Sequence, residues 1–299
     1  MIPYNSNCCF KDNNSYIYSC DNIRLKALVG EDEDCQNGFH CFFDNPKNLR
    51  ISDVVTRVSL GKYRYMWNVS CDKTTYTVLY WFNGYDNAQE NKRSVILDFN
   101  PNKMNDEELK EISYLLRFLV DVQIVRCDIA VDIPIPRKYV HLIKDNRTYE
   151  YQDHNENGIT EYLGSRNNTN FVKVYDKSRE SSLDEAITRV EITCEPVLSE
   201  FIKHSPTVLI EHEQISLELL EYDNLNSTHM AFVSVLKELD VQSRIKALKS
   251  IQRRLRAKLS PYVLSDTYRL EFDKTCVDNV FRWLRSCVYN KTFNISSQS

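Results

Sequence analysis

The chain has 299 residues, of which 42% are hydrophobic and 27% are charged, and its formal net charge is −4. These proportions are typical of a folded globular protein and exclude the collagen, coiled-coil and disordered classes. No apolar run approaches the roughly 18 residues that a membrane helix needs, and the N-terminus lacks a basic segment followed by an apolar one. We therefore expect a cytoplasmic location, no signal peptide and no membrane partner.

Several common sites are excluded by what the sequence lacks. The six glycines form neither GxGxxG nor GxxxxGK, so neither a Rossmann nucleotide site nor a P-loop is expected. The ten cysteines contain no CxxC pair, which leaves a zinc knuckle unsupported and predicts free thiols in a reducing compartment. The six histidines form no HxH or HExxH motif, and we assign them no role.

Strands dominate the predicted elements of the first half of the chain. Residues 74–82 are β-branched and aromatic, and the Asn-Gly pair at 83–84 predicts a turn after them. Residues 93–99 form a second predicted strand. A third, over 124–133, ends at Pro134.

One helix is predicted among these strands. Asn105 or Asp106 is the expected N-cap, and acidic residues fill the first turn. A short helix or turn is expected around 137–145. The apolar face of the predicted helix contains Leu109, Ile112, Leu116 and Leu119.

The second half begins with strands and continues as helix. The expected elements are a hairpin over 147–166 that turns at Asn157-Gly158, a strand over 171–177, a loop or short turn at 181–186, a strand over 187–195 and mostly helix from 197 to 260.

A run of strands followed by helices indicates an α+β fold with a largely antiparallel central sheet. We expect helices packed on one face of this sheet and a helical C-terminal part. The predicted parts are a β-rich N-terminal part over 1–90 (in the same unit or a small lobe), a catalytic core sheet over 91–205, and a helical, basic DNA-binding region over 206–299.

Positive charge is concentrated in the last part. Residues 244–299 contain 12 Lys and Arg against 4 Asp and Glu, a charge of +8, whereas the preceding residues carry −12. Apolar residues recur every three to four positions from 245 to 259, which predicts one amphipathic helix ended by Pro261. Its unmixed positive face indicates a nucleic-acid or other polyanion surface, the alternative being an ordinary solvated face. The predicted DNA-contacting residues are Arg244, Lys249, Arg253, Arg254, Arg256 and Lys258.

Alternation places charged side chains of three predicted strands on one face of the sheet, because residues two apart share a face. A solvated sheet face with ion pairs explains this pattern; the alternative is a site of carboxylate oxygens, suited to Mg²⁺ or Mn²⁺, beside a nucleophilic tyrosine. The residues on this face are Arg126, Asp128, Ala130 and Asp132; Lys173, Tyr175 and Lys177; and Arg189, Glu191, Thr193 and Glu195.

Three motifs in this order resemble a known family. They are RxDxAxD at 126–132, TEYLGSRNNTNFVKVYDKSRE at 160–180 and TRVEIT at 188–193. Together they resemble the Rep_trans family, the rolling-circle replication initiators of small Gram-positive plasmids and related relaxases of conjugative elements. The resemblance covers roughly residues 90–200.

The resemblance implies a nicking and closing enzyme that cuts one strand of a plasmid origin. Such an enzyme becomes joined through a tyrosine to the 5′ phosphate and leaves a 3′-OH for a polymerase. The tyrosine maps to Tyr175, and the metal-binding acids map to Asp128 and Glu191, with Asp132 and Glu195 as further candidates.

The chemistry adds expected roles for basic residues. A same-face lysine, Lys173 or Lys177, would help to deprotonate the phenol, whose pKa is near 10. Arg166 would clamp the phosphate. Tyr162, in the neighbouring motif, is the main alternative nucleophile.

Alternatives remain within and outside the resemblance. The chain is a plasmid initiator, a relaxase that nicks the transfer origin of a conjugative element, or a non-catalytic DNA-binding regulator of the same fold. For the first, the expected partners are plasmid origin DNA with an extruded single strand, a second copy of the chain and a host helicase.

Overall fold

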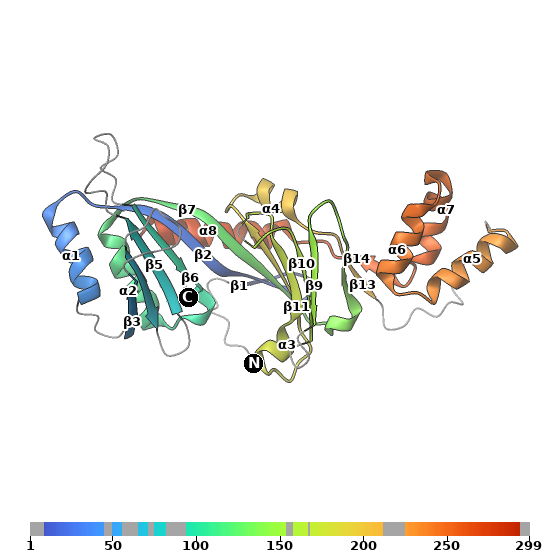
Figure 1. The fold of residues 1–299 in the computed structure, drawn as a ribbon, viewed down its shortest axis with the longest axis horizontal. Helices are drawn as coiled ribbons and strands as arrows, with labels where there is room; N and C mark the ends of the chain where they lie inside the picture. Colours follow the sequence, from blue (N-terminus) through green and yellow to red (C-terminus); the bar gives the residue numbers. More distant parts are fainter. Residues whose placement is uncertain are drawn as a thin grey trace.

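The computed structural model describes residues 9–44, 50–55, 65–70, 75–81, 94–153, 158–166, 168–211 and 225–293 (Figure 1). Within these residues one 11-stranded antiparallel sheet dominates, in the strand order β3-β4-β5-β6-β2-β7-β12-β11-β10-β9, with β1 paired to β2. Its strands are β1 (Cys9–Lys11), β2 (Ile17–Val29), β3 (Arg50–Val55), β4 (Tyr65–Ser70), β5 (Thr75–Trp81), β6 (Ser94–Phe99), β7 (Leu119–Ile133), β9 (Tyr149–Asp153), β10 (Ile159–Leu163), β11 (Val172–Asp176) and β12 (Thr188–Cys194).

A second, three-stranded sheet and the helices complete the described part. The small sheet has the order β14-β13-β8, from β14 (Thr267–Arg269), β13 (Val208–Glu211) and β8 (Val140–Leu142). The helices are α1 (Glu33–Asp44), α2 (Asp106–Arg117), α3 (Lys177–Ser181), α4 (Leu198–His204), α5 (Ser227–Lys237), α6 (Val241–Ser250), α7 (Arg253–Val263) and α8 (Lys274–Tyr289), with 3-10 turns η1 (Pro101–Lys103) and η2 (Arg137–Tyr139).

The long strands β2 and β7 lie side by side along the middle of the molecule (Figure 1). Alternate side chains of β7, those of Cys127, Ile129 and Val131, are almost completely buried in the main core. Helices α2 and α8 pack against β7, and their apolar residues join the same core. The predicted α+β class, with a mostly antiparallel central sheet and helical C-terminal part, is confirmed.

The predicted helix is present but ends earlier than expected. Asn105 caps α2 by accepting hydrogen bonds from the backbone of Glu107 and Glu108, and the Glu108 side chain bonds back to the Asn105 backbone. The helix ends at Arg117. Leu119, expected on its apolar face, instead begins β7 and pairs with Val29, so this leucine is buried by the sheet.

The other predicted strands agree closely with the observed ones where the chain is described. β5 and β6 match the first two, β7 extends the third toward the N-terminus, and β9 pairs with β10 as the expected hairpin. Of the two expected turns, residues 83–84 and 157 lie outside the described residues, whereas Gly158 has the positive φ of +73° that favours glycine. Around 137–145 the chain forms η2 and then β8. In the region expected to be mostly helical, β13 is a strand that links β8 to β14.

The basic segment forms two helices rather than the single predicted one. The backbone is extended at Ile251, so α6 ends at Ser250 and α7 begins at Arg253. Pro261 lies inside α7 instead of ending the helix. The break lets both helices turn apolar residues toward α5. The resulting second core consists of Leu225, Val233, Leu236, Leu248, Leu259 and Val263.

Two further expectations concern the whole chain. Among the described helices none is long and apolar enough to cross a membrane. None of the eight cysteines in the described part forms a disulfide. β3, β4 and β5, from the predicted N-terminal part, lie in the same sheet as the strands of the predicted core; the division into three parts stays a prediction.

Candidate active site

The strand register brings the predicted polar residues together in rows across one sheet face. Directly opposite residues of an antiparallel pair lie on the same side of a sheet. Arg189 of β12 is opposite both Asp132 of β7 and Tyr175 of β11. Glu191 is opposite Lys173 in the next row. The predicted constellation is therefore a single surface of β7, β12 and β11.

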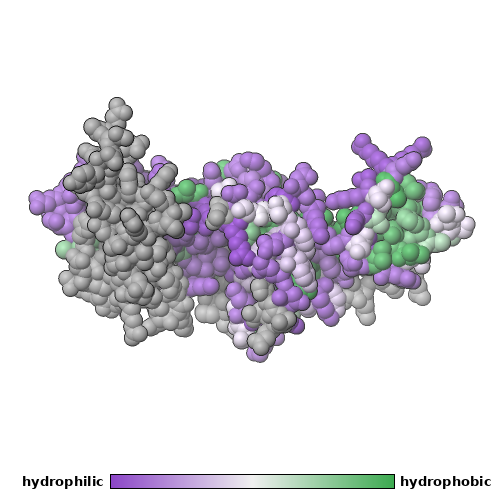
Figure 2. Space-filling view, viewed as in Figure 1, coloured by the Kyte–Doolittle hydropathy of each residue, from purple (hydrophilic) through white to green (hydrophobic). Residues whose placement is uncertain are grey.

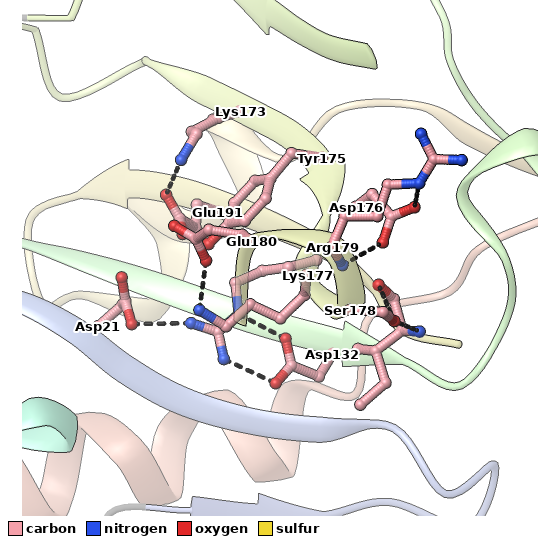
Figure 3. Close-up of polar contacts among 12 residues, drawn as sticks. Asp21, Asp132, Lys173, Tyr175, Asp176, Lys177, Ser178, Arg179, Glu180 and Glu191 are labelled. Atoms are coloured by element: carbon pink, nitrogen blue, oxygen red, sulfur yellow. Dashed lines mark hydrogen bonds and ion pairs between the residues drawn. The ribbon is translucent and has the colours of Figure 1, made fainter. Parts of the chain in front are cut away.

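Tyr175 and Glu191 form the central contact of this face (Figure 3). The Tyr175 hydroxyl donates a hydrogen bond of 2.6 Å to Glu191 Oε1, and the tyrosine is only 4% exposed. The Lys173 ammonium lies 3.7 Å from the centroid of the Tyr175 ring and 3.9 Å from Glu191 Oε2. The phenol thus faces a proton acceptor on one side and a cation on the other.

Burial changes the proton affinities of this pair. Burial, followed by the negative charge of Glu191, raises the pKa of Tyr175 above its ordinary value. Burial and the negative charge of Asp21 raise the pKa of Glu191 to about 7. The hydrogen bond from the Tyr175 hydroxyl places Glu191 where it can take the proton of the tyrosine.

Arg189 holds a fixed positive charge next to Tyr175. Its Nε and Nη2 donate hydrogen bonds of 2.5 and 2.7 Å to the two oxygens of Asp132, and its Nη1 donates one of 2.8 Å to Asp21. Burial opposes this charge, but the hydrogen bonds to Asp132 and the charges of both carboxylates raise the pKa of Arg189. The arginine is 3% exposed, so its guanidinium is part of the folded interior.

Asp21 is the residue of this site that sequence reasoning missed. It lies at a bulge of β2, between Cys20 and Asn22, where the register with β7 shifts. Because a bulge interrupts the alternation of side chains, no period in the sequence assigns Asp21 to the polar face. The carboxylate bonds to Arg189, which with Lys103 and Lys177 keeps the pKa of Asp21 below its ordinary value despite burial.

The predicted metal ligands do not all remain available to a cation. Asp132 has both oxygens on Arg189, so its predicted role as a ligand is replaced by ion pairing with that arginine. Within the described part, Asp128 forms neither of the ion pairs, with Arg126 or Arg189, that would make it structural, and its buried Oδ1 has no hydrogen-bond partner there. Burial raises the pKa of Asp128. In the residues described, no group of three His, Cys, Asp or Glu is arranged to hold a metal ion.

Two carboxylates nevertheless fit one hard cation. Mg²⁺ is commonly bound by one or two carboxylates together with substrate phosphates, and it requires oxygen ligands. Asp128, with its unbonded oxygen, and Glu191 lie on the same face, and the charge of Asp21 raises the pKa of each. Asp128 and Glu191 are therefore the residues of this face that could hold Mg²⁺ or Mn²⁺.

The rival tyrosine has a different environment. The Tyr162 ring stacks on Phe171 with centroids 5.7 Å apart, and its hydroxyl donates a 3.3 Å hydrogen bond to Gln152. Arg166, expected to clamp a phosphate, lies over the Tyr162 ring at 4.9 Å from the centroid. Tyr162 therefore has a packing role and lacks the carboxylate contact of Tyr175.

The other lysine and glutamate of the predicted face lie at its margins. Lys177 begins α3, directly after the strand that carries Tyr175, and forms an ion pair with Glu180. Its ammonium lies 5.9 Å from the Tyr175 ring centroid. Glu195 is exposed just beyond the end of β12.

The structure divides the predicted DNA-contacting residues into two groups. Arg244 is buried: it forms an ion pair of 2.6 Å with Asp266 and bonds to the Leu239 and Lys237 carbonyls, which corrects its assignment as a DNA contact. Arg256 is half-buried and donates to the carbonyls of Lys249 and Ile251 at the end of α6. The exposed residues are Lys249, Arg253, Arg254 and Lys258.

The surface over α5, α6 and α7 is mixed in character. Figure 2 shows hydrophobic and hydrophilic residues next to each other over this unit. The exposed apolar residues there include Met230, Phe232, Val235 and Leu239.

No family model matches the chain, and no curated protein matches it. Among solved structures, the chain is similar to that of a rolling circle replication initiator protein from Geobacillus stearothermophilus, with 14% sequence identity over 82% of this chain and 96% of that chain and a TM-score of 0.37. A TM-score this low does not show a shared fold.

Proposed function

We propose that the protein is a DNA nicking and closing enzyme of the Rep_trans kind that uses Tyr175 as its nucleophile. The observation that carries this proposal is the 2.6 Å hydrogen bond from the Tyr175 hydroxyl to Glu191, on a sheet face that also holds Lys173 and Arg189. The three sequence motifs that resemble the family supply the residues of this face. The resemblance of these motifs supports DNA as the substrate, because the contacts of the face do not by themselves identify a substrate.

The proposed reaction is a transesterification. Tyr175 Oη attacks a backbone phosphorus, forming the bond between the phenol oxygen and phosphorus and breaking the bond from phosphorus to the 3′ oxygen. Glu191 accepts the phenol proton, and the departing 3′ oxygen takes up a proton to give a free 3′-OH. The positive charges of Arg189 and Lys173 stabilise the negative charge that develops on the phenol oxygen. Because a phosphotyrosine ester replaces a phosphodiester, the reverse reaction reseals the strand without ATP.

A divalent metal ion is part of this proposal. Asp128 and Glu191 would hold Mg²⁺ or Mn²⁺, which would supply a Lewis acid for the non-bridging phosphate oxygens. Asp132 is assigned a different role, that of holding Arg189 in place.

The proposed substrate is the origin DNA of a plasmid in the cytoplasm. The exposed basic residues Lys249, Arg253, Arg254 and Lys258 support a duplex-binding role for α6 and α7, since positive charge supplies phosphate affinity. A second copy of the chain and a host helicase are the partners that the family resemblance implies.

Adduct formation tests the proposed reaction. The native chain, incubated with a pool of single-stranded oligonucleotides and Mn²⁺ or Mg²⁺, is expected to give a DNA–protein adduct on a denaturing gel. Tyr175→Phe should form none, whereas Tyr162→Phe, which removes a hydroxyl of the neighbouring strand, should retain adduct formation. EDTA should abolish the adduct. An adduct that persists in Tyr175→Phe and disappears in Tyr162→Phe would overturn the assignment of the nucleophile.

A further inference from the structure

Arg126 is a motif residue that the proposed chemistry does not use. It lies on β7 on the same face as Asp128 and Asp132, because these residues are separated by even numbers of positions. The side chain is half-buried, and its buried Nε has no hydrogen-bond partner in the described part of the chain. Since buried polar atoms in native structures are nearly always bonded, an unbonded guanidinium nitrogen here requires an explanation.

The neighbouring strand β2 places a second positive charge next to Arg126. Arg24 of β2 is directly opposite Arg126, and like charges directly opposite each other destabilise a pair of strands. Arg24 has its own partner, because its Nε donates a 2.8 Å hydrogen bond to Asp98 of β6. In this row of β6, β2 and β7, Arg24 is neutralised by Asp98, whereas Arg126 forms no ion pair with any residue that the structure describes.

The nearest carboxylate on the same strand does not neutralise Arg126. Asp128 is only two residues away and its pKa is affected by the charge of Arg126, yet within the described residues no ion pair joins the two side chains and Asp128 Oδ1 is itself unbonded. Asp128 has a hydrogen bond with the Thr193 side chain, whereas the Nε of Arg126 has no partner in the described residues and is left for a ligand. A guanidinium offers its donors in a fork that matches the oxygens of a phosphate group.

We propose that Arg126 binds a backbone phosphate of the DNA strand, separate from the phosphate that Tyr175 attacks. Arg126 precedes Asp132, which lies in the row of Tyr175, by six positions of β7, a distance of roughly 20 Å along the strand at about 3.3 Å per residue. The ligand is therefore a phosphodiester further along the same single strand. This identification of the strand rests on the proposed function.

Binding of single-stranded DNA tests the site without requiring cleavage. The full chain carrying Tyr175→Phe, which lacks the hydroxyl that would form an ester, is titrated against a fluorescent mixed-sequence oligonucleotide of about 20 nucleotides, long enough to span both phosphates, and anisotropy is measured from low to high salt. Arg126→Gln, Arg126→Lys and Arg282→Gln are compared in this background. Arg282 is the matched control, because it is an exposed arginine of α8, the helix that packs into the core against β2 and β7.

Arg126→Gln should weaken binding and reduce the slope of log K against log salt by about 0.7, the value for one neutralised phosphate on a single strand. Arg126→Lys should keep the slope, since it retains the charge, and this rescue separates removal of the charge from unfolding of the chain. The proposal is overturned if Arg126→Gln matches Arg282→Gln in affinity and slope, or if the parent chain binds no strand. Adduct formation by the native chain is measured in parallel. If no adduct forms but Arg126→Gln still weakens binding and reduces the slope, the proposed nicking activity is overturned and the phosphate site at Arg126 is supported.

Discussion

The sheet face around Tyr175 and the basic C-terminal helices use charge in different ways. On the sheet, alternation and register bring charged residues of several strands to one surface. There the Tyr175 hydroxyl donates a hydrogen bond to the Glu191 carboxylate. In the helices, a run that is uniformly positive in sequence is divided by the fold. Arg244 turns inward to Asp266, and Arg256 bonds to the end of α6. Counting positive charges in the sequence therefore overestimates how many of them a helix can offer to DNA. In a strand, by contrast, the alternation of side chains gives the composition of a sheet face directly.

The largest expected effect concerns Glu191. Glu191→Gln keeps the size of the side chain but removes the oxygen that can take the tyrosine proton, so adduct formation should slow by about 10²- to 10⁴-fold. The control is Glu150→Gln, an exposed carboxylate on β9. Initial rates from quenched time courses on denaturing gels make the comparison. Equal rates for the two variants would show that Glu191 does not accept the proton of Tyr175.

Arg189 should be the most important charge for stability. Arg189→Met leaves the buried Asp132 and Asp21 carboxylates without their cation, and we expect a decrease of about 3 to 5 kcal/mol in the free energy of unfolding. Arg179→Met removes the ion pair of the exposed Arg179 with Asp176 and should change the free energy of unfolding by less than about 1 kcal/mol. Urea denaturation followed by circular dichroism compares them. A small effect at Arg189 would mean that its carboxylates are well solvated.

The smallest expected effect concerns DNA binding by the C-terminal helices α6 and α7. Replacing Arg253 and Arg254 by Gln should reduce the slope of log K against log salt for duplex DNA by about 0.9 for each phosphate that is no longer neutralised. Arg244→Gln should leave that slope unchanged while lowering the thermal midpoint, because its guanidinium bonds inside the helical unit. Filter binding and thermal unfolding measure the two quantities. The division into exposed and internal arginines is wrong if Arg244→Gln reduces the slope as the exposed pair does.

Much of the sheet could be predicted because its signals are local. The alternation in Arg126–Asp132 and Arg189–Glu191 assigns each residue to a face, and strand pairing then needs only one register. Asp21 could not be predicted, since a bulge has no period. Nor could the role of Asp132: the sequence places it on the polar face, but only the tertiary structure shows that Arg189 takes both of its oxygens.

The helical part was less predictable for a related reason. The apolar positions from 245 to 259 fit one continuous helix, and no glycine marks the break at Ile251. The break follows from burial of Leu248 and Leu259 around α5, a contact between segments that a local pattern does not contain. Leu119 is a similar case. It fits the apolar face of α2 in sequence, but in the structure it begins β7 and pairs with Val29 of β2.

The central claim is that Tyr175 forms the covalent bond to DNA. The most direct measurement is peptide mapping by mass spectrometry of the adduct that the native chain forms with single-stranded oligonucleotides and Mn²⁺, after nuclease trimming and proteolysis. We predict a nucleotide attached through phosphate to the peptide that contains Tyr175 and to no other tyrosine. Attachment at Tyr162 or at another residue, or the absence of any adduct with these oligonucleotides, would contradict this assignment.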